Sequence, residues 1–223
     1  YVSITNLLTN IDVDQPTMGA VAGAISSIQI SSAGSIVDTI ATFGKANAAQ
    51  GYGVIGGISG TNSSYHPTAQ YITSDIDFNL SHKDGGAGLI GTAGGMVSFE
   101  GKATTISNGL FTGSINVTGV KDNWSKTSGG LTRNFESNYV TKSAMMAKEL
   151  NGDNIYNVTG NNTNTNAFNK VAVLDSVGGT HLDNTSTALT VADADKYKAS
   201  TYADKLGWDM YFTWGIQEGK SYP

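Results

Sequence analysis

The sequence predicts an all-β protein built as a right-handed parallel β-helix (a β-solenoid), with coils of about 34 residues, a small helical insertion and a C-terminal cap. Three observations lead to this fold class. Similar segments begin at residues 4, 36, 72 and 106, so successive starts lie 32, 36 and 34 residues apart. Apolar and polar residues alternate within these segments, as they do along a half-buried strand. Only three prolines occur beside 28 glycines, so Gly, Asn, Asp and Ser must form most turns.

The alternation indicates strands rather than helices in these four segments. In the third segment Ile76, Phe78 and Leu80 alternate with polar residues, and residues 110–117 alternate in the same way in the fourth. No long stretch of these units keeps the 3.6-residue spacing of an amphipathic helix. Several short strands without a helix between them are typical of one solenoid coil, in which each strand pairs with its equivalent in the next coil. Crossover connections between parallel strands are almost always right-handed, so we expect a right-handed coil.

The repeat pattern ends near residue 133 and divides the chain into three regions. Residues 1–133 are expected to form the solenoid coils, residues 134–170 an insertion, and residues 171–223 a last coil with an aromatic C-terminal cap. Within the insertion, residues 141–152 (TKSAMMAKELNG) have an N-cap candidate, helix-forming residues and a terminal glycine. This combination predicts a short helix, which a polar, Asn-rich loop follows.

The C-terminal region combines a short expected helix with a cluster of aromatic side chains. The helix is expected around residues 193–198, where Asp193 and Asp195 would cap and open it. The open end of a solenoid exposes strand edges that invite edge-to-edge aggregation, so the preferred interpretation of the aromatic cluster is a cap. The alternative is a stacking platform for sugar rings. The candidate platform residues are Tyr202, Trp208, Tyr211 and Trp214.

Composition excludes several classes of function. The formal net charge is −5, only 14% of residues are charged, and Arg133 is the only arginine. Nucleic-acid binding needs clusters of Lys and Arg, so we expect no nucleic-acid partner. No apolar run reaches the 18 or more residues of a membrane helix, so we expect no membrane insertion. The absence of cysteine excludes thiol nucleophiles, Cys-ligated metals and disulfides.

Two glycine-rich segments match the dinucleotide-binding pattern G-x-G-x-x-G, namely residues 51–56 (GYGVIG) and 86–91 (GAGLIG). A dinucleotide turn needs a buried strand before it and a helix after it, whereas polar residues precede the second segment and further glycines follow it. We therefore expect no cofactor and interpret both segments as corners of successive coils. On this interpretation Gly56 and Gly91 stack, with Gly23 as another copy, at one strand spacing of ~4.8 Å per coil.

Two Asp-x-Asp pairs are the candidate metal ligands. Residues i and i+2 of a strand share a face, so Asp12 with Asp14 and Asp75 with Asp77 could offer paired carboxylates to Ca²⁺. The preferred interpretation is that they are solvated carboxylates on the outer face, at matching positions of the repeat. No H-E-x-x-H or G-x-S-x-G motif occurs, so the sequence predicts no catalytic residues.

The runs GVIGG (residues 53–57) and GLIG (residues 88–91) resemble the core of the GLUG repeat of bacterial surface and secreted proteins. The closing segment, residues 200–223 (STYADKLGWDMYFTWGIQEGKSYP), is similar to the segment that ends GLUG arrays, except that Met210 stands where Phe is usual. The resemblance covers most of the chain apart from residues 134–170. It implies a β-helical, adhesin-like array in an extracellular or cell-surface bacterial protein. It carries no catalytic residues.

The sequence as a whole predicts a non-catalytic module of a bacterial surface or secreted protein that acts as an adhesin stalk or scaffold. Host-surface glycans or proteins are its candidate ligands, and adjoining repeats or other domains of the same parent chain are candidates for stacking on it. One alternative is a solenoid enzyme that degrades polysaccharides, with carboxylates clustered on one sheet opposite a Lys or Arg, or the accessory region of a secreted peptidase. Another is an ice-binding solenoid, for which the chain offers a single Thr-x-Thr match at residues 163–165.

Overall fold

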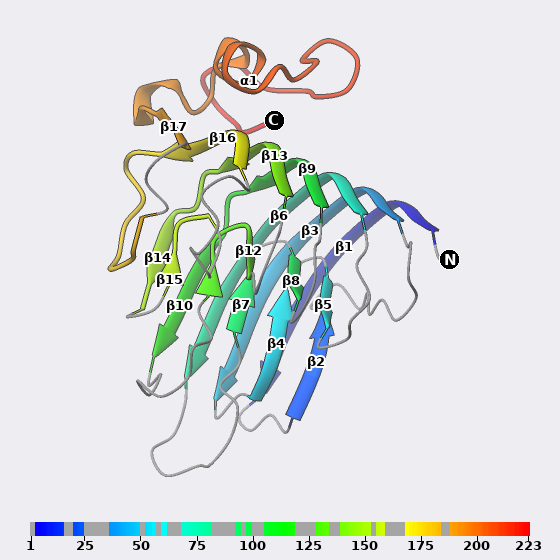
Figure 1. The fold of residues 1–223 in the computed structure, drawn as a ribbon, viewed down its shortest axis with the longest axis vertical. Helices are drawn as coiled ribbons and strands as arrows, with labels where there is room; N and C mark the ends of the chain where they lie inside the picture. Colours follow the sequence, from blue (N-terminus) through cyan, green and yellow to red (C-terminus); the bar gives the residue numbers. More distant parts are fainter. Residues whose placement is uncertain are drawn as a thin grey trace.

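The structure of the protein is a computed structural model. Among the described residues the protein is mostly β-structure, with its strands in three parallel sheets and one short α-helix near the C-terminus (Figure 1). This confirms the prediction of a predominantly parallel β fold. The described ranges are 3–15, 20–24, 36–49, 52–56, 59–61, 68–81, 92–94, 97–99, 105–118, 128–133, 139–152, 155–158, 168–183 and 188–223.

The largest sheet has nine strands, and every described pairing in it is parallel. Seven strands follow in chain order, β1-β3-β6-β9-β13-β16-β17, while β10 pairs with β6 and β14 pairs with β10. The bounds are β1 (Ser3–Gln15), β3 (Ile36–Ala49), β6 (Thr68–Ser81), β9 (Thr105–Phe111), β10 (Ser114–Thr118), β13 (Tyr139–Met145), β14 (Glu149–Asn151), β16 (Phe168–Leu174) and β17 (Ala188–Val191).

Two smaller parallel sheets repeat the same order. We call the successive stretches of chain that begin with β1, β3, β6, β9, β13 and β16 passes. In each of the first five passes the chain goes from the large sheet to a five-stranded sheet, and in three of them it then adds a strand to a three-stranded sheet. The five-stranded sheet contains β2 (Ala20–Ala24), β4 (Tyr52–Gly56), β7 (Thr92–Gly94), β11 (Ser128–Gly129) and β15 (Ile155–Tyr156). The three-stranded sheet contains β5 (Ser59–Thr61), β8 (Val97–Phe99) and β12 (Thr132–Arg133).

The main core lies between the large sheet and the smaller ones. Ile72 and Phe78 of β6 are fully buried there, together with Leu131 and Ile155 from the smaller sheets and their turns. Gly113, between β9 and β10, is required by close packing, because a Cβ at this position would lie 2.1 Å from the backbone oxygen of Ile76. The inward residues of successive strands therefore stack closely enough to exclude a side chain at this corner.

The repeat spacing agrees with the sequence, but the predicted register is wrong. Residues joined across neighbouring strands are 33, 32, 37 and 34 positions apart along the first five passes. Ile4 pairs with Val37, which pairs with Ala69, rather than with the predicted starts at Ile36 and Ile72. At the second start Ile36 and Val37 are adjacent and both apolar, so the pattern alone cannot choose between them.

The glycine stack is also shifted from its predicted register. Gly56 pairs with Ala24 on one side and with Gly94 on the other, while Gly23 pairs with Ile55. Gly91 lies outside the described residues, and its predicted place beside Gly56 is taken by Gly94. The segment 52–56 nevertheless forms a strand between two parallel neighbours rather than a turn that leads into a helix, which agrees with its assignment to the repeat.

One position bends every long strand of the large sheet, and we call its residues the left-handed column. Each residue has a φ between 46° and 57°, and each lies between two positions that pair with their equivalents in the next strand. A non-glycine residue in this conformation costs roughly 1–2 kcal/mol, so the surrounding ladders must impose the bend. The column consists of Asn6, Thr39, Tyr71, Asn108, Lys142 and Lys170.

The helix expected over residues 141–152 is wrong. This segment forms β13 and β14, and β13 pairs with β9 on one side and β16 on the other. Two flanking ladders satisfy its backbone groups, and they override the helix preference of its Met, Ala, Lys and Leu residues. Lys142 is left-handed, with a φ of 46°, which a right-handed helix cannot contain. Thus this part of the predicted insertion continues the large sheet.

The expected C-terminal helix begins later than the sequence suggested. Residues Asp193–Asp195 form a 3₁₀ turn without a side-chain cap, and α1 (Ala199–Leu206) follows. Gly207 ends α1 in the left-handed conformation and donates its N–H to Ala203 and Tyr202, a role that favours glycine. Among the described residues, no helix has the length and apolar character needed to cross a membrane.

Candidate functional site

The outer face of the large sheet, opposite the main core, contains the best-formed candidate site. One row of residues crosses this face along the pairing register from the first strand to the last, and it therefore passes through very different surroundings. The row consists of Leu8, Ala41, Thr73, Leu110, Ala144, Ala172 and Leu189.

The residues after β17, 192–223, form what we call the C-terminal segment, and it covers the middle of this row. Leu110, Ala144 and Ala172 are at most 2% exposed, and they share a second apolar cluster with Tyr202 and Trp208 of the C-terminal segment. Figure 1 shows this segment folded beside the ends of β13 and β16, above the large sheet. The aromatic cluster thus covers part of the outer face of the large sheet. It forms a second core, separate from the main core on the other face of the sheet.

Hydrogen bonds fix the C-terminal segment to the sheet. The Trp208 indole Nε1 donates a hydrogen bond of 2.7 Å to the backbone oxygen of Lys142. Lys142 belongs to the left-handed column. The Tyr222 hydroxyl donates to the backbone oxygen of Met146 at 3.4 Å. Burial, with a smaller effect of neighbouring phenols and carboxylates, raises the pKa of both Tyr202 and Tyr222 well above the usual range. Both phenols therefore stay neutral where they pack.

The predicted aromatic platform is divided between buried and accessible rings. Tyr202 and Trp208 are nearly parallel and buried, with ring centres 5.3 Å apart, and Trp214 lies 4.0 Å from Trp208 at an interplanar angle of 6°. Tyr211 is 87% exposed and makes an edge contact with Phe212. Tyr202 and Trp208 therefore serve packing, which leaves Trp214 and Tyr211 as the accessible members of the predicted platform.

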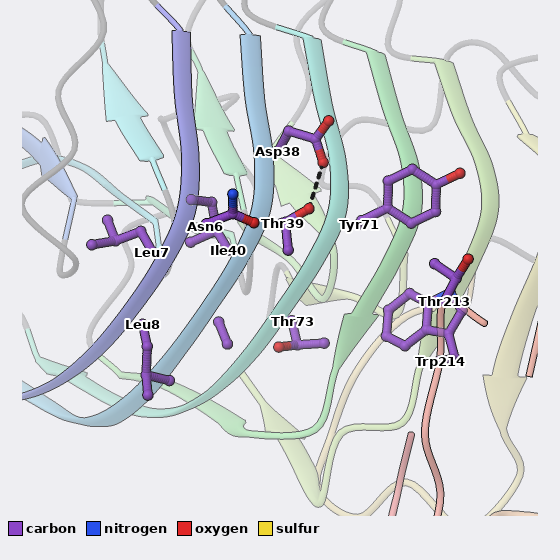
Figure 2. Close-up of a pocket in the computed structure, with 11 residues that line it drawn as sticks. Asn6, Leu7, Leu8, Asp38, Thr39, Ile40, Tyr71, Thr73, Thr213 and Trp214 are labelled. Carbon is purple, nitrogen blue, oxygen red and sulfur yellow. Dashed lines mark hydrogen bonds between the residues drawn. The ribbon is translucent and has the colours of Figure 1, made fainter. Parts of the chain in front are cut away.

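A cavity of about 750 Å³ continues from the covered region over β1, β3 and β6. We call it the outer groove (Figure 2). Its floor comes from three adjacent strands, with Asn6, Thr39 and Tyr71 of the left-handed column on it, and Thr213 and Trp214 of the C-terminal segment form its side. The cavity is thus lined by both the large sheet and the C-terminal segment.

Polar groups are held in place along the outer groove. One carboxylate oxygen of Asp38 accepts a hydrogen bond from the Thr39 hydroxyl at 2.8 Å, and the other accepts one from Gln70 Nε2 at 2.6 Å. Asp38 and Gln70 occupy the row just before the left-handed column, so the register of β3 and β6 places them side by side. Asp38 is the one charged residue among the described residues that line the groove.

The structure separates the candidate Ca²⁺ ligands into two surroundings. Asp12 pairs with Lys45, whose backbone N–H donates to the Asp12 carboxylate at 3.0 Å, and Lys45 pairs in turn with Asp77. Asp14 begins a different row, which continues through Asn47 on β3. The two Asp pairs are therefore not at matching positions of the repeat, because Asp12 is in register with Asp77 and not with Asp75.

Lys148 makes ion pairs with both members of the second Asp pair. Its Nζ lies 3.0 Å from Asp75 and 3.6 Å from Asp77, and the Ser114 hydroxyl donates to Asp77 at 2.8 Å. Burial alone would lower the pKa of Lys148, but the hydrogen bond and attraction of the two carboxylates outweigh it and raise that pKa. Within the described residues, no group of three or more His, Cys, Asp or Glu side chains could hold a metal ion.

The row that begins at Asp14 continues as a ladder of asparagines. Asn79 donates to Asn47 at 3.0 Å and Asn116 donates to Asn79 at 3.2 Å, from one amide side chain to the next. Asn79, in the middle of the ladder, both donates and accepts, because a side-chain amide carries a donor and an acceptor. This arrangement supports the assignment of this edge of the sheet to a structural role.

A smaller cavity of about 310 Å³ lies beside β16 and β17. His181, Asp183 and Asp175 contribute its polar lining, and His181 Nε2 lies 3.6 Å from an oxygen of Asp183. Asp183 also accepts a hydrogen bond from the Asn157 amide at 3.0 Å. None of the residues proposed from the sequence lies in this cavity.

Comparison of this chain with protein-family models, with curated proteins and with solved structures found no match.

Proposed function

We propose that this chain is a non-catalytic β-solenoid module of a bacterial cell-surface or secreted protein, which acts as an adhesin-like stalk or scaffold. The observation that carries the proposal is the order of the large sheet, in which strands from successive passes pair in parallel and bend at the same left-handed position. We interpret each pass as one coil of a right-handed parallel β-helix. The GLUG-like closing segment then covers the outer face of the last coils.

This architecture suits a mechanical role. Each pass contacts mainly its neighbours, so stiffness and resistance to proteolysis come from ladders that run the length of the array. The Asn47–Asn79–Asn116 amide ladder adds side-chain hydrogen bonds in the same direction. An extracellular location is supported by the GLUG-like motifs, and the surface is rich in Gly, Ser, Thr and Asn rather than in charged residues.

The proposal is tested with beads that carry the purified chain. We expect coated beads to adhere to cultured epithelial cells, and the folded chain to resist trypsin under conditions that digest the heat-unfolded chain. Beads coated with heat-unfolded chain are the control. Equal adherence of both bead types, together with rapid digestion of the folded chain, would contradict an adhesin-like module.

One observation favours a second candidate, a solenoid enzyme that degrades polysaccharides. Asp75 and Asp77 share one face of β6, and Lys148 lies against both, which is the arrangement of carboxylates and a cation that such an enzyme requires. The two carboxylates already make an ion pair with Lys148 and, at Asp77, a hydrogen bond with Ser114, however, and neither described cavity includes them. Reducing-sugar assays on neutral and acidic polysaccharides distinguish the candidates, since only the enzyme releases product that the Asp75→Asn variant fails to release.

A further inference from the structure

We propose that the outer groove binds a neutral oligosaccharide, with Trp214 and Tyr71 as its ring-stacking surfaces. This inference deepens the proposed function and rests on it in one respect, since the groove must face the outside of the cell to meet a glycan. Accessible aromatic rings, a polar lining and an elongated shape all fit such a ligand.

Trp214 offers an aromatic surface whose position is fixed. It packs against Trp208 at 4.0 Å, and Trp208 packs in turn against the fully buried Tyr202. Of these three nearly parallel rings, Trp214 is the one that lines the groove. A ring that is already supported by packing loses little conformational entropy on binding, which favours stacking on the apolar face of a sugar.

Tyr71 is the second aromatic surface, and it comes from the floor of the groove. It belongs to the left-handed column and is 37% exposed, although large aromatic side chains are usually buried. Tyr71 and Trp214 both line the groove, and Figure 2 draws their rings on the same side of it. A left-handed backbone is unfavourable for a bulky residue, so backbone preference alone does not select tyrosine at this exposed position.

The polar lining matches an uncharged ligand with many hydroxyl groups. Asn6, Thr39, Thr73 and Thr213 supply amide and hydroxyl groups that both donate and accept, and Asp38 supplies a fixed carboxylate. With a carboxylate as the one charge among the described lining residues, an anionic ligand would be repelled. Sugar hydroxyls can donate to Asp38, since each of its oxygens keeps a lone pair after accepting one hydrogen bond.

The shape of the groove favours an elongated ligand over a single small molecule. Its floor repeats across β1, β3 and β6 at the strand spacing of about 4.8 Å, with equivalent residues side by side. The groove also continues the interface that Trp208 makes with Leu110 on the same row. The sheet thus carries a bound segment of its own chain over one half and an open polar and aromatic track over the other.

The test measures binding of defined sugars to the purified chain by isothermal titration calorimetry and by tryptophan fluorescence. The neutral probes are cellohexaose, maltohexaose, mannohexaose and N-acetylchitohexaose, and the anionic probes are hexagalacturonate and a heparin hexasaccharide. We expect at least one neutral probe to bind and to quench tryptophan emission, and we expect no anionic probe to bind. The Tyr71→Asn variant, which keeps a residue that tolerates the left-handed backbone, should weaken binding about tenfold.

Matched variants keep the test decisive. Trp214→Ala should weaken binding at least as much as Tyr71→Asn, whereas Phe212→Ala removes an exposed ring that does not line the groove and should leave affinity unchanged. Circular dichroism confirms that each variant is folded. Binding of no neutral probe, binding of anionic probes alone, or binding insensitive to Tyr71→Asn in the folded variant would each overturn the proposal.

Two further outcomes would overturn the sugar proposal without overturning the proposed function. Sedimentation that shows dimers of the chain, dissociated by Tyr71→Asn, would overturn the sugar proposal in favour of contact with a second copy. Failure of sugar binding together with adherence of coated beads to cells would overturn the groove proposal alone and leave the adhesin-like module standing.

Discussion

The outer face of the large sheet has two halves built on the same row of residues. Over β9, β13 and β16 the row is buried beneath the C-terminal segment, and Leu110 is 2% exposed. Over β1, β3 and β6 the same row is open, and Leu8 is 71% exposed. Equivalent positions of the repeat thus differ in environment because a non-repeating segment folds back over only part of the face. The difference separates a structural half from a half available for binding.

The largest expected effect comes from removing the anchor of the covered half. Trp208→Ala should lower the free energy of unfolding by about 3–5 kcal/mol, because it removes a buried ring, its packing with Tyr202 and the bond to the Lys142 carbonyl. Urea unfolding followed by circular dichroism measures the loss. As the control, Phe212→Ala removes an exposed ring of the same segment and should change stability by at most about 0.5 kcal/mol. Equal losses would show that the segment does not anchor the face.

The second prediction compares the two halves at one position of the row. Leu110→Ala should cost about 2–5 kcal/mol because the buried side chain leaves a cavity under the C-terminal segment. Leu8→Ala removes the same side chain from the open half and should cost at most about 0.5 kcal/mol. Thermal and urea unfolding of both variants give the comparison directly. A large loss for Leu8→Ala would mean that the open half is covered in solution.

High pH should act on the covered half in particular. Burial raises the pKa of Tyr202 and Tyr222, so both stay protonated in the folded state while the unfolded tyrosines lose protons near pH 10. Their contribution to stability is fully present below about pH 10 and falls as the pH rises further toward their folded pKa values. The measurement is the melting temperature between pH 8 and 11, which we expect to decline above about pH 10.

Tyr202→Phe supplies the control for this pH dependence. The variant removes one buried titrating group and should make the alkaline decline shallower. Lys148 also has a raised pKa and loses its charge in the same range, so Lys148→Met is measured beside it. If Tyr202→Phe declines as steeply as the unmodified chain, the covered half is not the source of the alkaline sensitivity.

The smallest expected effect concerns the left-handed column in the open half. Thr39 is β-branched with a φ of 55°, and Asn tolerates this conformation better, so Thr39→Asn should raise stability by about 0.5–1 kcal/mol. Thr73→Asn places the same new residue at an ordinary strand position beside it and should lower stability slightly, since Asn is unfavourable in strands. Differential scanning calorimetry detects shifts of this size. The reverse order would contradict a strained column.

Much of the fold could be predicted from the sequence because strand alternation and repeat spacing are local patterns. Ile76 and Phe78 are buried, and Asp75 and Asp77 point to the other face, as the alternation indicated. Register was harder, because Ile36 and Val37 are equally apolar. The expectation of a helix over residues 141–152 failed for a physical reason, since pairing with β9 and β16 outweighs local helix preference.

The candidate site was less predictable than the fold. The aromatic cap candidates included Trp214, but nothing in the pattern indicates that Asn6, Thr39 and Tyr71 meet it in one groove. That meeting depends on the C-terminal segment folding back over strands that lie about 140 to 210 residues earlier along the chain. The left-handed column was missed because bends were expected at glycines, whereas six other residues occupy it.

The left-handed column also gives the array a tolerance to insertions. The number of residues between equivalent positions varies, with steps of 33, 32, 37 and 34, yet the rows of the outer face continue without a break. Each long strand of the large sheet has its bend near its start, and the residues on both sides of the bend stay in register with the neighbouring strand. A change in the length of a preceding loop therefore does not shift the residues that line the outer groove. Loops can therefore vary in length without disturbing the groove.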